Sequence, residues 1–364
     1  MPLLAICKSK KRGEHEKYKI HKDCAVTDEC TPCTFTSESV VQAYWRLQLF
    51  PLLQPHMRSA TLVARHAHAS LPPSFYTNAL APDIVLYRST MPLIDFYIIS
   101  VGELKHSDNI EGKHCGQLAK YAQVLFELHP HRQRIYAWLA TQNTIRLFKF
   151  EADDHCKLSS VETSQDYSYE EGLQHLCSML RLDLPDLGVF ADPIPMPGSP
   201  GDGLVPIRYL GRGSFATAYA AAKPTGDGFL VIKLFRVGAS GACALQCEQQ
   251  TLLHLAEHNI KGVTTLVGSA AYPSRLEAAE PTALVLEPEG VTLERVVRNK
   301  QRTTKYRLTR MLPLYNHNLE IFADDALCKL LDIVRDVHVI GDVVHCDLSL
   351  DNMYFLPNGE VRTN

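Results

Sequence analysis

The sequence predicts an α+β protein built of two globular halves. The chain has 364 residues, which is more than one ordinary domain of about 100–200 residues holds. A hydrophobic fraction of 46% is enough to fill two cores. Prolines and glycines crowd residues 191–203 and leave little room for helix or sheet there. We therefore expect four segments: a polar, cysteine-bearing leader (1–36), a first domain (37–190), a linker (191–203) and a second domain (204–364).

Helical and strand-like patterns alternate in the first half. Apolar residues at helical spacing behind Ser37 predict a helix, and Pro130 ends a second one. Strand-like apolar runs lie between and after these helices. The predicted order is α-β-β-α-β-β, at residues 37–49, 83–88, 95–106, 115–128, 134–141 and 144–150.

In the second half, strands precede most of the helices, an order typical of α+β domains. We expect strands at 207–222 and 229–235, a helix at 244–258, strands at 263–267 and 283–286, and helices at 293–298 and 324–340.

Composition narrows the classes of function. A net charge of −3 gives no global attraction to nucleic acid or to anionic membranes, although residues 113–149 form a basic segment. Eleven cysteines without regular spacing favour a reducing compartment, nucleus or cytoplasm. The apolar start is too short for a signal peptide, and no run reaches the roughly 18 apolar residues of a membrane span. We expect no membrane partner.

The leader carries two weaker signals. His21, Cys24, Cys30 and Cys33 have the spacing of a small zinc site, with free thiols in a flexible leader as the alternative. The basic cluster at 8–12 is either a nuclear address or a solvated surface segment.

Two aromatic and two histidine side chains in the basic segment also have alternative interpretations. Tyr136 and Trp138 share one face of a strand, where core packing is favoured over stacking on nucleic-acid bases. His129 and His131 flank Pro130, and we expect surface or phosphate-facing groups rather than metal ligands.

The first half contains a constellation suited to phosphodiester cleavage. Asp83 begins one strand, and Glu103 and Lys105 share a face at the end of the next. Two carboxylates can bind Mg²⁺, and a lysine beside them can position and activate a water molecule. The alternative is a surface ion pair of Glu103 with Lys105, which would contribute about 0–1 kcal/mol.

This arrangement resembles the PD-(D/E)XK nuclease-like superfamily, whose core has the same α-β-β-α-β order. The resemblance implies that Asp83, Glu103 and Lys105 are catalytic, that Asp83 and Glu103 bind the metal, and that DNA is a partner. Gln117 and Tyr121 lie one helical turn apart and face the same way. Glu38 is a further candidate carboxylate. Such folds also serve as binding modules without cleavage.

A second constellation begins the second half. Gly211 and Gly213 lie in a turn between two apolar runs, where main-chain amides can cradle phosphates. Lys233 lies inside an apolar strand, and burial of an ammonium group is costly unless an anion meets it. Glu248, on the following helix, can be that anion.

With the segment Leu284–Pro288 and the loop from His345 to Asn352, these motifs resemble the protein kinase superfamily. The resemblance implies that Lys233 binds ATP phosphates and pairs with Glu248, with Gly211, Gly213 and Glu287 at the nucleotide site. It also implies that Asp347 orients the accepting hydroxyl and that Asn352 binds Mg²⁺. Ala216 and Cys346 depart from the family pattern, and the sequence stops before an Asp-Phe-Gly site, so we expect an incomplete domain.

The two halves together resemble Crinkler-type effectors and fungal-type protein kinases, which implies action in a nucleus, either that of its own cell or that of a host. The sequence thus predicts a Ser/Thr protein kinase using ATP and Mg²⁺, fused to a nuclease-like domain. The alternatives are a Mg²⁺-dependent DNA endonuclease acting through Asp83, Glu103 and Lys105, and a non-catalytic pseudokinase module.

Overall fold

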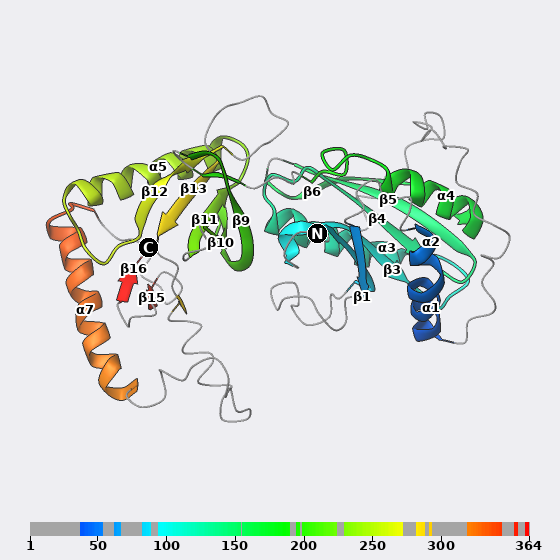
Figure 1. The fold of residues 1–364 in the computed structure, drawn as a ribbon, viewed down its shortest axis with the longest axis horizontal. Helices are drawn as coiled ribbons and strands as arrows, with labels where there is room; N and C mark the ends of the chain where they lie inside the picture. The colour runs from blue at the N-terminus through cyan, green and yellow to red at the C-terminus, as the bar shows by residue number, and fades with distance from the viewer. Residues whose placement is uncertain are drawn as a thin grey trace.

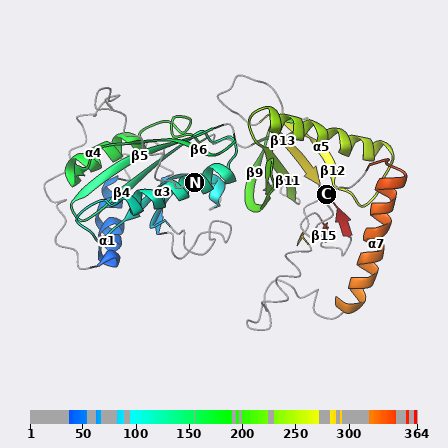
Figure 2. The same cartoon turned by 180° about the vertical axis from the view of Figure 1, so that it is seen from behind.

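The fold combines helices and sheets in two halves that lie side by side, seen from opposite sides in Figures 1 and 2. It is described here by a computed structural model. The structure describes residues 37–53, 62–66, 82–88, 94–153, 155–189, 194–196, 199–223, 229–271, 282–287, 291–292, 319–343, 353–355 and 361–363.

The first half is built on one sheet of order β1-β2-β3-β4-β5-β6, with β7 pairing with β5. Its neighbouring strands are antiparallel except β3 and β4, which are parallel. Parallel neighbours need a crossover, and helix α3 provides it. The strands are β1 (Leu62–His66), β2 (Ile84–Arg88), β3 (Ile98–Leu104), β4 (Arg134–Ala140), β5 (Thr144–Ala152), β6 (Leu158–Thr163) and β7 (Tyr167–Ser168).

Helices cover both faces of this sheet, because the central strands are apolar on both sides. Helix α3 (Gly112–Leu128), with the short 3₁₀ helix η7 (Asp95–Tyr97), packs on one face. On the other face lie α1 (Glu38–Tyr44), its continuation through the π-helical turn η3 (Trp45–Leu49) and α2 (Phe50–Leu53), and α4 (Tyr169–Leu180). Trp45 stacks on Trp138 there, with ring centroids 6.4 Å apart.

The second half contains a sheet of order β12-β13-β11-β10-β9-β8, with helix α5 (Ala239–Glu257) packed on one face. Its strands are β8 (Ile194–Met196), β9 (Ser199–Arg212), β10 (Ala216–Ala222), β11 (Phe229–Phe235), β12 (Thr265–Ala270) and β13 (Ala283–Glu287). A small sheet holds β14 (Val291–Thr292), β15 (Met353–Phe355) and β16 (Val361–Thr363), and α7 (Leu319–Val339) is the last helix.

The opposite face of the second sheet packs against the first half, as both ribbon views agree (Figures 1 and 2). One cluster of buried apolar side chains is continuous across the two halves and includes Phe96, Leu128, Tyr219 and Ile232. The rings of Phe96 and Tyr219 meet edge to face at 5.1 Å. The two halves therefore share part of their core.

The six elements predicted for the first half are found as α1, β2, β3, α3, β4 and β5, but the predicted order is incomplete, because β1 precedes β2 and β6, β7 and α4 follow β5. The expectation that residues 191–203 hold no regular structure is wrong: β8 and the start of β9 pair there, with Ile194 opposite Leu204. Proline is tolerated in such a strand because β8 lies at the edge of its sheet. The helix expected at 293–298 and the zinc candidates His21, Cys24, Cys30 and Cys33 lie outside the described residues.

Candidate functional site

The sheet of the first half brings Asp83, Glu103 and Lys105 together. Strands β2 and β3 are antiparallel, and Ile84 lies opposite Gly102, so the start of β2 meets the end of β3. Asp83 directly precedes β2, and Glu103 lies near the end of β3. Both carboxylates are almost fully buried, with Asp83 2% and Glu103 1% exposed.

Two hydrogen bonds fix the carboxylate of Asp83. The side-chain amide of Gln42, on α1, donates to Oδ1 at 2.7 Å. The main-chain amide of Leu104 donates to Oδ2 at 2.8 Å. Sequence reasoning missed Gln42, although it lies four residues after Glu38 and therefore on the same face of the helix.

One carboxylate oxygen of Glu103, Oε1, accepts hydrogen bonds from the side chains of Lys105 and Gln117. Lys105 Nζ contacts Glu103 Oε1 at 2.5 Å and Glu38 Oε1 at 3.4 Å. The amide nitrogen of Gln117, on α3, also donates to Glu103 Oε1 at 2.7 Å and to the hydroxyl of Tyr121 at 2.6 Å. The structure thus brings together all three predicted residues and the accessory side chains of α1 and α3.

The electrostatics of the site favour an added cation. Burial raises the pKa of Glu103 to about 7, the negative charge of Asp83 adds to this rise, and Lys105 opposes it. Burial lowers the pKa of Lys105, but the carboxylates of Glu103, Asp83 and Glu38 together outweigh this effect, so the net shift of its pKa is upward. Three carboxyl groups, those of Glu38, Asp83 and Glu103, thus surround a single ammonium group.

The residues present fit a magnesium ion. Glu103 Oε2 is buried and has no hydrogen-bond partner among the described residues, so one carboxylate oxygen is available as a ligand. Mg²⁺ commonly takes one or two protein carboxylates and completes its shell with water and phosphate oxygens. In the described part of the chain no group of three or more His, Cys, Asp and Glu side chains has metal-binding geometry, so a site with two carboxylates is the arrangement to consider.

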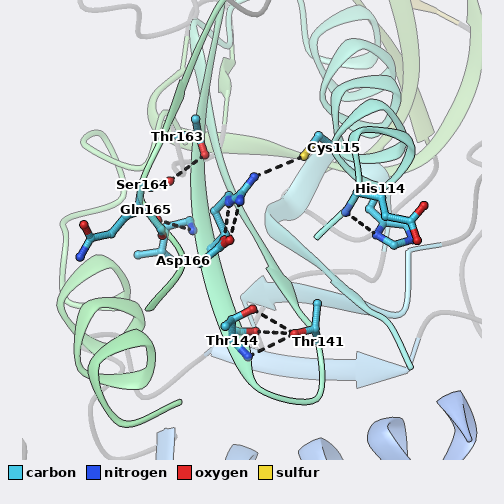
Figure 3. Close-up of polar contacts among 11 residues, drawn as sticks. His114, Cys115, Thr141, Thr144, Thr163, Ser164, Gln165 and Asp166 are labelled. Carbon is cyan, nitrogen blue, oxygen red and sulfur yellow. Dashed lines mark hydrogen bonds and ion pairs between the residues drawn. The ribbon is translucent and has the colours of Figure 1, made fainter. Parts of the chain in front are cut away.

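The basic segment 113–149 offers less positive surface than its sequence indicates. Arg132 is buried and donates hydrogen bonds to the carbonyls of Ile98 and Ile99. Arg146 forms a two-pronged ion pair with Asp166, at 2.6 and 2.7 Å, and also reaches Cys115 (Figure 3).

The prediction that His129 and His131 lie at the surface is wrong, and the prediction that Tyr136 and Trp138 pack in the core is confirmed. His129 and His131 are 3% and 1% exposed and face the interior, not phosphate or solvent. Tyr136 and Trp138 are buried in the core, as core packing requires. Burial of His129 and His131 lowers the pKa of both side chains.

In the second half, the predicted lysine and glutamate meet. Lys233 Nζ, on β11, lies 2.7 and 2.6 Å from the two carboxylate oxygens of Glu248, on α5. Gly211 lies near the end of β9, which β10 separates from β11, and Gly213 lies in the turn to β10. Glu287, at the end of β13, pairs with Lys223 at 2.8 Å, so its side chain already has a partner. Asp347 and Asn352 lie outside the described residues.

No protein-family model matches the sequence, and no curated protein has significant similarity to it. Within the described residues, no helix combines the length and apolarity that crossing a membrane requires.

Proposed function

We propose that the first half is a metal-dependent nuclease site that cleaves phosphodiester bonds in DNA. The observation that carries this proposal is the buried pair Asp83 and Glu103, with one oxygen of Glu103 left without a partner among the described residues. A buried carboxylate is costly unless a cation meets it. Lys105 meets the other oxygen of the same group.

Each side chain then has a distinct role. Asp83 and Glu103 hold the ion, and Gln42 and Gln117 keep these carboxylates in place through their hydrogen bonds. Lys105, 16% exposed at its side chain, orients the attacking water and favours its deprotonation through its positive charge. The bound Mg²⁺ supplies Lewis-acid stabilisation of the negative charge that develops on the phosphate.

Cleavage of supercoiled plasmid in Mg²⁺ tests this proposal. Asp83→Asn and Glu103→Gln are expected to abolish nicking, and Lys105→Met to slow it by about 10²-fold or more. Glu162→Gln is the matched control, because this exposed carboxylate lies on β6, outside the site. Nicking that survives Glu103→Gln would refute the assignment.

A second candidate function concerns the second half, which we propose binds ATP and transfers its γ-phosphate to Ser or Thr of a protein substrate. The close pair of Lys233 and Glu248 supports it, because such a pair holds a lysine in place to bind nucleotide phosphates. Lys233→Met is expected to abolish ATP binding, and Asp347→Ala to abolish transfer of labelled phosphate while ATP still binds. ATP affinity unchanged in Lys233→Met would exclude this role. If the chain is a Crinkler-type effector, both activities would act in a nucleus.

A further inference from the structure

Strands β9 and β11, which flank β10, carry positive charge on opposite faces of the sheet. In the β10–β11 register, Ala218 pairs with Lys233 and Thr217 with Leu234, so neighbouring pairs face opposite sides. Lys233 faces α5, where it meets Glu248. Arg212 lies opposite Thr217 in the β9–β10 register and therefore faces the other side.

A hollow of about 490 Å³ opens on this second side. It is lined by Arg212, Gly213, Ser214 and Arg236. Burial lowers the pKa of Arg212, and the nearby positive charge of Arg236 lowers it further. Lys233 and Glu248 do not line the hollow, so its cationic side chains differ from the lysine proposed to bind ATP, although Gly213 of the proposed ATP site borders it.

One acidic group from the first half reaches this hollow's edge. Glu127, on α3, forms an ion pair with Arg212 through Oε2. No acidic side chain of the described residues forms an ion pair with Arg236. The carboxylate of Glu127 thus pairs with Arg212 alone, and the positive charge of the two arginines is only partly neutralised.

From this geometry we propose that the hollow is a second anion site, which binds the phosphoryl group of a small molecule between Arg212 and Arg236. When no phosphoryl group is bound, Glu127 forms an ion pair with Arg212. Guanidinium groups match phosphate oxygens with paired, charge-assisted hydrogen bonds. The hydroxyl of Ser214 adds a polar group at the same place.

Calorimetric titration with inorganic pyrophosphate at fixed ionic strength tests the site. Arg236→Gln is expected to weaken binding by about ten-fold or more, as loss of a charged hydrogen bond does. Glu127→Gln is expected to tighten binding by up to about five-fold, because a partly exposed competing ion pair is removed. Arg335→Gln, which removes the same charge from an exposed site on α7, is the control and is expected to change nothing.

Several outcomes would overturn the proposal. The proposal is wrong if pyrophosphate does not bind, or if Arg236→Gln leaves the affinity for pyrophosphate unchanged. It is also wrong if Lys233→Met abolishes pyrophosphate binding, because the anion would then lie on the other face of the sheet. Glu127→Gln without tighter binding would remove the competing role of Glu127. Titrations with AMP and adenosine distinguish a nucleotide from free phosphate as the ligand. If AMP binds more tightly than pyrophosphate and Arg236→Gln weakens AMP binding, the ligand is a nucleotide. AMP binding no tighter than pyrophosphate identifies free phosphate, and adenosine binding as well as AMP contradicts phosphoryl recognition.

Discussion

The hydroxyl of Tyr219, on β10 of the second half, donates a hydrogen bond to the main-chain carbonyl of Leu128, at the end of α3 in the first half. Both residues are buried. The neighbouring hydroxyl of Thr217 donates to the carbonyl of Glu127 at 3.1 Å. The end of α3 has main-chain carbonyls without helical partners, and strand β10 supplies donors to them. The second half thus caps a helix of the first.

We expect Tyr219→Phe to lower the free energy of unfolding by about 1–2 kcal/mol, because it leaves the buried carbonyl of Leu128 without this donor. Chemical denaturation measures the change. Tyr167→Phe serves as the control, since Tyr167 is only half-buried on β7, and a change within about 0.5 kcal/mol is expected there. Equal effects of the two substitutions would contradict a stabilising role for the Tyr219 hydrogen bond.

Stability is expected to fall in mild acid because of His131. Burial lowers the pKa of His131 to about 4, against an ordinary value of 6.5, while contact with the main chain of Phe235 opposes the shift. Between these pH values the unfolded chain holds a proton that the folded chain lacks, so acid favours unfolding.

From pH 7 to pH 5 the contribution of His131 to stability is expected to decrease by about 2 kcal/mol. His131→Phe removes this titration, so the denaturation free energy of the variant should fall less over the same interval, whatever its absolute stability. His129 lies nearby with its pKa also lowered, so part of the pH dependence is expected to remain. A variant with the same slope as the wild type would exclude His131 as its source.

The sequence predicts the first-half core because its signals are strong. Apolar runs at β2, β3, β4 and β5 and the helical spacing of α3 mark those elements. The site follows, since a carboxylate at the start of one strand and two charged residues at the end of the next converge when the strands pair.

Other features depend on tertiary contacts that local pattern does not encode. Strand β6 is largely exposed and polar, so its pairing with β5 leaves little periodicity. Helix α4 lies in an acidic stretch, although Leu173, Leu176 and Leu180 follow helical spacing and are buried. The burial of His131 results from the contact between the two halves, which no local sequence signal predicts.

Glycine is required at position 102, beside the catalytic candidate Glu103. A Cβ atom there would lie 2.3 Å from Cε2 of Trp138, whose ring is buried and packed against Trp45. Gly102→Ala is therefore expected to destabilise the fold by about 1–3 kcal/mol through overpacking. Gly116→Ala is the control, because nothing lies within 4 Å of its added Cβ on α3, and it should stabilise by up to about 1 kcal/mol. Thermal denaturation distinguishes these opposite signs.

Magnesium is expected to stabilise the folded protein through Asp83 and Glu103. A ligand that binds the folded state at ten times its Kd adds about 1.4 kcal/mol to the free energy of unfolding. Chelation by EDTA should reverse the gain, and Asp83→Asn or Glu103→Gln should abolish it.

Lys105→Met gives the sharpest comparison, because removing the ammonium group from Glu103 Oε1 lowers repulsion of the ion. This variant should retain or exceed the wild-type stabilisation by Mg²⁺ while losing plasmid cleavage. Loss of both would show that Lys105 holds the site together rather than acting on the water.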